Sequence, residues 1–458
     1  MSGITLNLIS AAMGGGAAPV GVLASIRDTR TTINNPKIAI RNDALTIAVT
    51  ALSPSFNFST TVARLPLDLS AFTWQTGVNT SNNGDAPQPA AITMDSAGNS
   101  IVAGSVYVAF NNLTFPYLLK VNSSGTFQWH RYINQSGSFS AVTTDSSDAI
   151  YPVGTGRYIF SNRDDILAAK YDASGTRQFL RVLGDTNLSN AFSYGQGVAL
   201  LNGTNYCIAS LVTDAGSNYD GCLWTLAQSD GAKVGATFQR DAANLTQQDG
   251  VAVIRGESAD VLYYLVNTYA GSFATKATQV LLKFTTAGGF VWQRFFTDPG
   301  AQTTLGYALC MDSSNTHVYA TARTTGAVGG RDEVLITKWA IDGSLVWQRG
   351  ITSPTNGLTQ PGIAVDSLDQ IYVTFLSSPV PNGNRAMVLK MPGDGSGSGN
   401  FATIDGIRYD YIATSRTAST DALTIADNSR ATQANTAAAV TPGSSIVAGA
   451  LALTNTPF

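Results

Sequence analysis

Short runs that alternate apolar and polar residues, separated by turn residues, fill most of the chain. The segment YLLKVNSSGTFQWHRYI (117–133) joins an apolar run to an aromatic-rich run through a Ser/Asn/Gly turn. This pattern is typical of a β-hairpin and not of a helix. The turn glycine, Gly125, can adopt the positive φ that such a turn often needs. The hydrophobic pattern therefore predicts an all-β fold built from hairpins.

The hairpin is repeated along the chain with a nearly constant spacing. A basic or apolar residue is followed five positions later by Gly in six copies, whereas a seventh copy, RLPLDL at Arg64, lacks the Gly. Successive copies begin 50–57 residues apart, at Arg64, Lys120, Lys170, Leu226, Lys283, Lys338 and Lys390. An aromatic residue follows each copy at Trp74, Trp129, Phe179, Phe238, Trp292, Trp347 and Phe401. The middle five aromatic residues are each followed two places on by an arginine: Arg131, Arg181, Arg240, Arg294 and Arg349.

A second hairpin lies between successive copies of the first. Its clearest copies are AITMDSAGNSIVAG (91–104), AVTTDSSDAIYPVG (141–154), ALCMDSSNTHVYAT (308–321) and GIAVDSLDQIYVTF (362–375), with weaker copies at 197–210 and 250–266. Two hairpins per repeat make four strands, and a four-stranded unit at this period is the signature of a β-propeller blade. The small residues that open this hairpin fit an innermost strand near a crowded central axis.

The aromatic residue and its arginine belong to the fourth, outermost strand of each blade. Residues two apart on a strand share a face, so each ring lies beside its arginine. We interpret the ring as packing between blades, with the arginine stem covering it and the guanidinium reaching water. We therefore predict a structural role, in preference to a role in recognition, for Trp129–Arg131 and its four sister pairs.

Six complete blades are predicted from about 91 to 406, and the remaining segments resemble halves of a seventh. Residues 58–77 supply a third and a fourth strand, while 437–453 resemble 90–106 and share the string Ser-Ile-Val-Ala-Gly with it. We therefore expect a seven-bladed propeller, residues 43–458, with one blade closed by N- and C-terminal strands. Six blades with flanking β-structure is the alternative. Residues 1–42 are interpreted as an arm or attachment segment, and 407–436 as a long insertion of the kind that often carries binding functions.

Composition supports this fold and excludes several function classes. Charged residues make up 12% of the chain, the net charge is −3, and there are 44 glycines. Without a basic run, no nucleic-acid footprint is predicted. No apolar run approaches the ~18 residues of a membrane span, so membrane insertion is not expected. The N-terminal stretch lacks a basic n-region, so no cleaved secretion signal is expected. The sequence leaves open whether Cys207 and Cys222 form a disulfide.

Few residues are suited to chemistry. The two histidines are isolated: His130 occupies a position where sister copies have glutamine, and His317 lies in a predicted turn. No metal site of usual zinc or copper ligands, no cofactor site and no catalytic residue is predicted. The recurring Asp95, Asp145, Asp312 and Asp366 could ring the channel and hold Ca²⁺. We favour the alternative that each caps its own turn.

The Asp-Ser turns and the Lys-to-Trp hairpins together resemble the bacterial β-propeller repeat (SBBP-like) found in secreted and particle-borne proteins. The resemblance covers residues 58–406 and the C-terminal strands. The low charge and the Thr/Asn/Gly-rich surface also resemble the style of bacteriophage virion proteins, especially tail components.

This resemblance implies a non-enzymatic virion structural protein, a tail fibre, adaptor or host-adhesion component. It would contact other tail proteins through residues 1–42 and a host surface glycan or protein through its loops. The location implied is the virion, or otherwise the extracellular space. Two alternatives remain: a secreted bacterial carbohydrate- or protein-binding propeller, and a propeller glycan lyase or hydrolase that uses channel carboxylates.

Overall fold

The computed structural model consists of β-strands joined by turns and loops. It describes residues 4–10, 22–28, 32–52, 58–80, 86–109, 112–157, 164–183, 192–201, 203–213, 219–239, 248–258, 260–268, 277–287, 289–297, 303–328, 330–378, 383–397, 399–404, 407–413, 417–419, 448–449 and 453–457. In these ranges there is no helix, and hence no helix long and apolar enough to cross a membrane.

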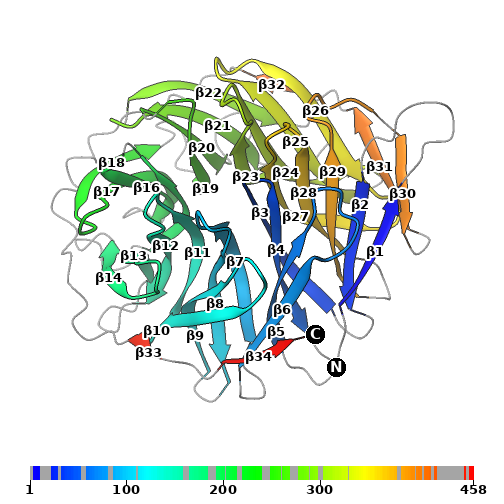
Figure 1. The fold of residues 1–458 in the computed structure, drawn as a ribbon. Helices are drawn as coiled ribbons and strands as arrows, with labels where there is room; N and C mark the ends of the chain where they lie inside the picture. Colours follow the sequence, from blue (N-terminus) through cyan, green and yellow to red (C-terminus); the bar gives the residue numbers. More distant parts are fainter. Residues whose placement is uncertain are drawn as a thin grey trace.

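Seven antiparallel sheets stand around a common axis, which confirms the predicted seven-bladed propeller (Figure 1). From the inner to the outer strand, blade 1 is β3 (Thr32–Arg41), β4 (Ala44–Leu52), β5 (Phe58–Leu65) and β6 (Trp74–Thr80). Blade 2 is β7 (Ala86–Met94), β8 (Ser100–Val108), β9 (Leu113–Val121) and β10 (Phe127–Ile133). Blade 3 is β11 (Gly137–Thr144), β12 (Ile150–Arg157), β13 (Asp164–Tyr171) and β14 (Arg177–Leu183). Blade 4 is β15 (Ser193–Leu200), β16 (Asn205–Thr213), β17 (Tyr219–Ala227) and β18 (Lys233–Gln239).

The remaining three blades follow in chain order. Blade 5 is β19 (Gln248–Arg255), β20 (Val261–Thr268), β21 (Thr278–Thr285) and β22 (Phe290–Thr297). Blade 6 is β23 (Thr303–Met311), β24 (His317–Val328), β25 (Arg331–Ala340) and β26 (Leu345–Thr352). Blade 7 is β27 (Gly357–Val365), β28 (Ile371–Ser378) and β29 (Arg385–Met391), completed by the N-terminal strand β2 (Val22–Asp28).

The ring closes in blade 7, not in blade 1. Strand β2 pairs antiparallel with β29, with Val22 opposite Lys390. Residues 58–77 do lie in a third and a fourth strand, as predicted, but the first two strands of that blade are β3 and β4. Their hairpin turns at Asn42 and Asp43, both at positive φ, which is the geometry of a two-residue hairpin loop. The C-terminal segment therefore does not supply the missing strands of this blade: Ala448 and Gly449 pair with the outer strand of blade 2, and Leu453 pairs with Thr80 at the outer edge of blade 1. Residues 437–447 and 450–452 lie outside the described residues.

Additional strands cover the outer edges of five blades. β1 (Ile4–Ser10) pairs with β2, and β31 (Ile407–Ala413) pairs with β26 and with β30 (Gly399–Ile404). At the other edges, β32 (Thr417–Ser419) pairs with β22. β33 (Ala448–Gly449) pairs with β10, and β34 (Leu453–Pro457) pairs with β6. The described C-terminal strands therefore run backwards around the rim, over blades 6, 5, 2 and 1. Such covering satisfies the backbone groups that an outermost strand would expose.

This topology changes two predicted boundaries. Residues 1–42 contain β2 and β3, which are integral propeller strands, so the segment is not an arm separate from the propeller. The start of the predicted insertion 407–436 is β31 on the edge of blade 6, and 420–436 lie outside the described residues. Phe401 lies in β30 and so is not in the fourth strand of blade 7.

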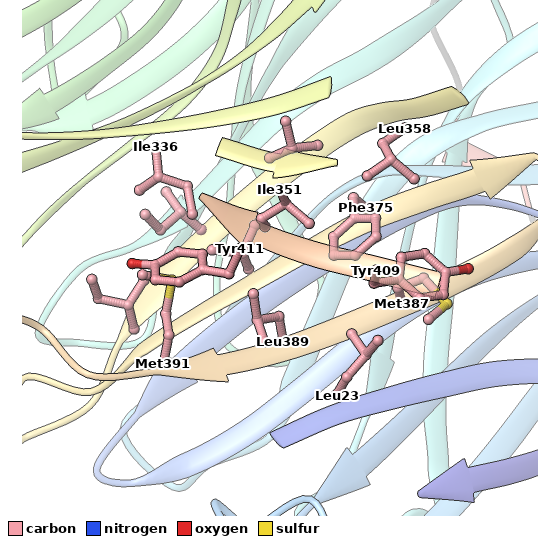
Figure 2. Close-up of a cluster of buried hydrophobic side chains, with 14 of the residues drawn as sticks. Leu23, Ile336, Ile351, Leu358, Phe375, Met387, Leu389, Met391, Tyr409 and Tyr411 are labelled. Atoms are coloured by element: carbon pink, nitrogen blue, oxygen red, sulfur yellow. The ribbon is translucent and has the colours of Figure 1, made fainter. Parts of the chain in front are cut away.

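Apolar side chains between the blades form the core. The largest cluster joins blades 6 and 7 to β2 and β31, and Leu23, Phe375, Met387 and Tyr409 belong to it (Figure 2). Leu23 is 1% exposed and Tyr409 is fully buried, so strands from both chain ends contribute to this cluster. Closure is thus stabilised by hydrophobic burial as well as by strand pairing.

Candidate functional site

The aromatic–arginine pairs lie at the junctions between blades. The Trp129 ring lies against Gly175 in the turn of the next blade, where an added Cβ would be 2.9 Å from the ring. The Arg131 guanidinium lies 5.3 Å from the ring centroid of Trp129, and its Nε donates to the Gly175 carbonyl at 2.7 Å. The turn glycine is therefore required twice, for its φ of 81° and for its missing side chain.

Two further junctions repeat this arrangement with the same atoms. Arg294 donates from Nε to the Gly343 carbonyl, and Arg349 donates from Nε to the Gly395 carbonyl, each at 2.7 Å. Arg294 and Arg349 also cover the rings of Trp292 and Trp347, and Arg181 covers Phe179. The guanidinium groups of Arg131, Arg294 and Arg349 therefore bind the next blade. The prediction from the sequence that they reach water is wrong for these three residues.

The anchor lysine is a third member of the junction that the sequence analysis did not assign. Lys120, Lys283 and Lys338 donate from Nζ to carbonyls in the next blade's turn at 2.9–3.1 Å. Lys170 does the same to Gln228 at 2.9 Å. We call the aromatic residue, its arginine and this lysine the blade latch. Each latch joins one blade to the next, so its position offers a structural role and no open recognition surface.

Blade 4 departs from the predicted latch. In its β-ladder Thr225 pairs with Gly235, as Lys170 pairs with Phe179 in blade 3. Gly235 therefore stands at the aromatic position, and Phe238 follows it three residues further along β18. Arg240 lies outside the described residues. An added Cβ at Gly235 would meet no atom of the described residues within 4 Å, so among these residues blade 4 has open space where other blades place a ring.

The four recurring aspartates cap their own turns. Asp95 accepts hydrogen bonds from the amides of Ala97 and Asn99 and forms an ion pair with Lys120 at 2.8 Å. Asp145, Asp312 and Asp366 likewise accept amide hydrogen bonds from residues two to five positions further along the chain. In the described residues, no group of three acidic, His or Cys side chains could hold a metal. The four aspartates are thus not brought together as a Ca²⁺ site.

Neighbouring turns are also joined to each other. Ser96 donates from its amide and its hydroxyl to Asp148 of blade 3, at 2.7 and 2.6 Å. Ser313 donates from its amide to Asp369 between blades 6 and 7, and Ser367 donates from its amide and its hydroxyl to Asp43 between blades 7 and 1. The Asp-Ser turns that carried the repeat signal therefore connect blades at this face of the propeller.

His317 is a partner of Asp312 and is not a free surface side chain. Its Nδ1 lies 2.8 Å from the Asp312 carboxylate, and Asp312 is buried, with 5% of its surface exposed. Burial raises the pKa of Asp312, but hydrogen bonds from His317 and from the turn amides outweigh it and lower the pKa to about 2. Cys207, Cys222 and Cys310 are free thiols, so Cys207 and Cys222 do not form a disulfide.

An open cavity of about 260 Å³ lies on the propeller axis. All seven innermost strands line it, through residues such as Ile38, Ile92, Val198, Leu309 and Ile363. Each innermost strand carries a β-bulge at its middle, seen as a shift in register before Lys37, Ala91, Ala141, Gly197, Ala252, Ala308 and Gly362. Bulges redirect side chains and are common beside functional sites.

Three polar side chains interrupt the apolar wall of this cavity. Gln196 and Tyr307 are bulge residues of blades 4 and 6, and Lys37 follows the bulge of blade 1. The residues that line the cavity include no Asp or Glu. A mostly apolar pocket with a few converging polar groups is the usual form of a small-molecule site, and such sites have volumes of ~300–1,000 Å³. The axial cavity is therefore the candidate functional site.

The sequence analysis placed small residues at the axis but did not find this site. The signal was present in the sequence, since Gln196 and Tyr307 each immediately precede a copy of the second hairpin, 197–210 and 308–321 in turn. Lys37 could not be aligned with them because the β3–β4 hairpin lacks the Asp-Ser turn of the repeat.

Comparison with known proteins gives a likeness of fold. No known family matches the chain, and no curated protein is similar to it in sequence. Among solved structures, the phage phi92 endosialidase has a TM-score of 0.46 at 8% identity, over 82% of this chain and 69% of that one. An α-L-arabinanase of Penicillium chrysogenum has a TM-score of 0.41 at 11% identity, over 79% and 93% of the two chains. A sialidase of Trypanosoma rangeli has a TM-score of 0.40 at 9% identity, over 81% of this chain. This chain spans 56% of the length of that sialidase.

These structures correct one prediction. The sequence analysis expected a protein without enzymatic activity, whereas these three propellers of similar fold are a sialidase, an endosialidase and an arabinanase. A non-enzymatic role therefore does not follow from the fold. At such low identity the likeness concerns the fold alone, and no residue role is transferred from these proteins to this chain.

Proposed function

We propose that this chain is a carbohydrate-binding β-propeller that holds a single sugar unit in its axial cavity. The observation that carries the proposal is the wall of that cavity, where Gln196, Tyr307 and Lys37 interrupt a lining of small and aliphatic residues. An amide, a phenol and an ammonium group offer the hydrogen-bond donors and acceptors that sugar hydroxyls need. The apolar residues between them suit the C–H faces of a sugar ring.

The size of the cavity limits the ligand. A volume of about 260 Å³ lies just below the ~300–1,000 Å³ range of small-molecule sites. One ring, or the terminal unit of a longer glycan, is therefore the expected occupant. The seven rigid blades position the lining residues, so little ordering is expected on binding.

The test is calorimetric titration of the intact protein with a panel of neutral and acidic monosaccharides and their methyl glycosides. We expect saturable binding of at least one sugar, and a loss of at least tenfold in affinity for Gln196→Ala and Tyr307→Ala. The matched control is Gln128→Ala, which removes an exposed bulge glutamine from β10 and should leave binding unchanged. Equal binding by all four proteins, or no binding of any sugar, would reject the proposal.

Cleavage is measured in the same mixtures, by the release of reducing ends from oligosaccharides. Release that depends on Gln196 or Tyr307 would extend the proposal from sugar binding to glycoside hydrolysis.

We also propose that the propeller is displayed on a particle such as a bacteriophage tail, where several copies would act together through avidity. Mass spectrometry of purified particles tests this part. A chain that is absent from virions and free in the medium would favour a secreted binding module instead.

A further inference from the structure

One position on the cavity wall breaks the symmetry of the ring. The first residue after the bulge is small in six blades: Ala91, Ala141, Gly197, Ala252, Ala308 and Gly362. In blade 1 the same position is Lys37, which pairs with Ala48 on β4. Six small residues therefore leave space near the axis, and Lys37 of blade 1 lines the same cavity.

The Lys37 ammonium has no counter-ion there. In the described part of the chain it makes no hydrogen bond and no ion pair, and the cavity lining contains no carboxylate. Tyr307 is the other titratable side chain on the cavity wall. Desolvation in the cavity lowers the pKa of Lys37 from its usual value, as expected for an amine without a partner of opposite charge.

The neighbouring cation on the same strand face does have a structural role. Arg41, four residues further along β3, donates to the Met94 carbonyl at 2.7 Å and to the Thr144 hydroxyl at 3.2 Å. It thus connects blade 1 to blades 2 and 3 at the turn end of the innermost strands. Lys37 makes no such connection, although apolar residues occupy equivalent positions in the other blades without loss of the fold.

Lys37 is partly exposed in the cavity, and a cation that has no counter-ion there is stabilised when a group of opposite charge binds beside it. The attraction is strong inside the protein because the effective dielectric constant is lower than that of water. We propose that Lys37 is an anion-binding residue, and that the axial cavity prefers a ligand with a carboxylate, such as an acidic sugar, over its neutral counterpart. The preference for an acidic sugar rests on the proposed function, whereas anion binding at Lys37 does not depend on it.

The closing experiment compares two sugars that differ in one group. Methyl glucuronide carries a carboxylate where methyl glucoside carries a hydroxymethyl group, and each is titrated into the wild-type protein and into Lys37→Met. Methionine keeps the length of the side chain and removes the charge. We expect the glucuronide to bind at least tenfold more tightly than the glucoside, and Lys37→Met to abolish this preference by weakening the glucuronide at least tenfold more than the glucoside. Lys233→Met, which removes a lysine that lies over the Trp224 ring, is the matched control and should keep the preference.

A second measurement does not depend on sugar binding. The ¹³Cε signal of Lys37, assigned by its absence in Lys37→Met, is followed during titration with acetate, sulfate and the glucuronide. We expect the signal to shift saturably and the Lys37 pKa to rise when an anion is bound. Thermal unfolding of Lys37→Met checks that the variant is folded.

The outcomes separate the two proposals. Equal binding of both glycosides with an unresponsive Lys37 signal overturns the inference and leaves the proposed function standing. A response to acetate or sulfate without any sugar binding supports the anion site and rejects the sugar. If the signal is silent to every anion, Lys37 only fills space and the inference fails.

Discussion

Two junctions of the same ring are held by opposite arrangements. Between blades 6 and 7, Trp347 projects from the outer strand and lies against Gly395, a turn glycine at a φ of 68°. Between blades 7 and 1, the equivalent strand position is Val22 and the equivalent turn position is Leu69, at a φ of 56°. The large side chain therefore comes from the outer strand between blades 6 and 7, and from the turn between blades 7 and 1.

The closing junction compensates for its missing latch with apolar contacts. Leu69 is fully buried in a cluster with Ala24 and Ile26 of β2, and Leu67 and Phe72 from the same loop pack against this cluster. Holding a leucine in the left-handed region costs about 1–2 kcal/mol, which this burial must offset. The comparison teaches that a repeat can lose its motif and keep its packing, provided that strand and turn change together.

The largest expected effect is at the closing strand. Leu23→Asp places a charge in the cluster between β2 and blades 6 and 7, where Leu23 is 1% exposed. We expect a loss of about 4 kcal/mol or more in the free energy of unfolding, because the carboxylate gains no partner there. Urea unfolding monitored by tryptophan fluorescence measures it. Val346→Asp, at a side chain that is 48% exposed, is the control and should change stability by less than ~0.5 kcal/mol.

The regular junction is tested by Trp347→Ala. Trp347 is 8% exposed, and removing it also removes the surface that Arg349 covers. We expect a loss of about 3–5 kcal/mol in the free energy of unfolding, from the cavity and the lost ring contacts. Phe290→Ala, at an exposed ring in blade 5, should be nearly neutral. A loss below ~1 kcal/mol for Trp347→Ala would show that the latch is dispensable.

The hairpins could be predicted from the sequence because their signals are local. Asp-Ser turns, turn glycines and alternating runs predicted six complete blades. Five of these blades contain four consecutive strands, whereas blade 7 contains three and is completed by β2. Ring closure could not be predicted in the same way, since the pairing of Val22 with Lys390 depends on two segments more than 350 residues apart in the sequence. The β3–β4 hairpin was missed because its Asn42–Asp43 turn differs from that of the repeat, although Asn-Asp between apolar runs is itself a hairpin signal. Lys37 was missed with it.

The reversal at the closing junction predicts a coupling between Val22 and Leu69. Val22→Trp alone should destabilise by ~1–3 kcal/mol because the turn already fills the space. Leu69→Gly alone should also destabilise, since it removes a buried side chain, although it relieves the positive φ. The double variant recreates the arrangement of Trp347 and Gly395. We expect a favourable coupling of ~1–2 kcal/mol in a double-mutant cycle of urea unfolding. Additive losses would contradict the reversal.

An effect of similar size concerns acid stability at the turn of blade 6. The pKa of Asp312 is about 2 when folded, against 3.8 as its ordinary value, so its stabilising effect is present above pH ~4 and is lost as the pH falls towards 2. The shift corresponds to about 2 kcal/mol. Asp312→Asn should therefore lower the free energy of unfolding at pH 6, and its difference from wild type should shrink by pH 2.5. A pH-independent difference would show that the carboxylate charge is not involved.

The smallest expected effect is a gain, at the blade that has lost its ring without a replacement. Gly235 stands at the aromatic position of blade 4, and an added Cβ there meets no atom of the part of the chain that the structure describes within 4 Å. Gly235→Phe should stabilise the protein by ~1 kcal/mol, because glycine weakens a strand. The same change at Gly175 should instead destabilise strongly, since a Cβ would lie 2.9 Å from Trp129 on a backbone at positive φ. Urea unfolding measures both changes. If both raised or both lowered the free energy of unfolding, the idea that strand and turn side chains must match in size at a junction would be contradicted.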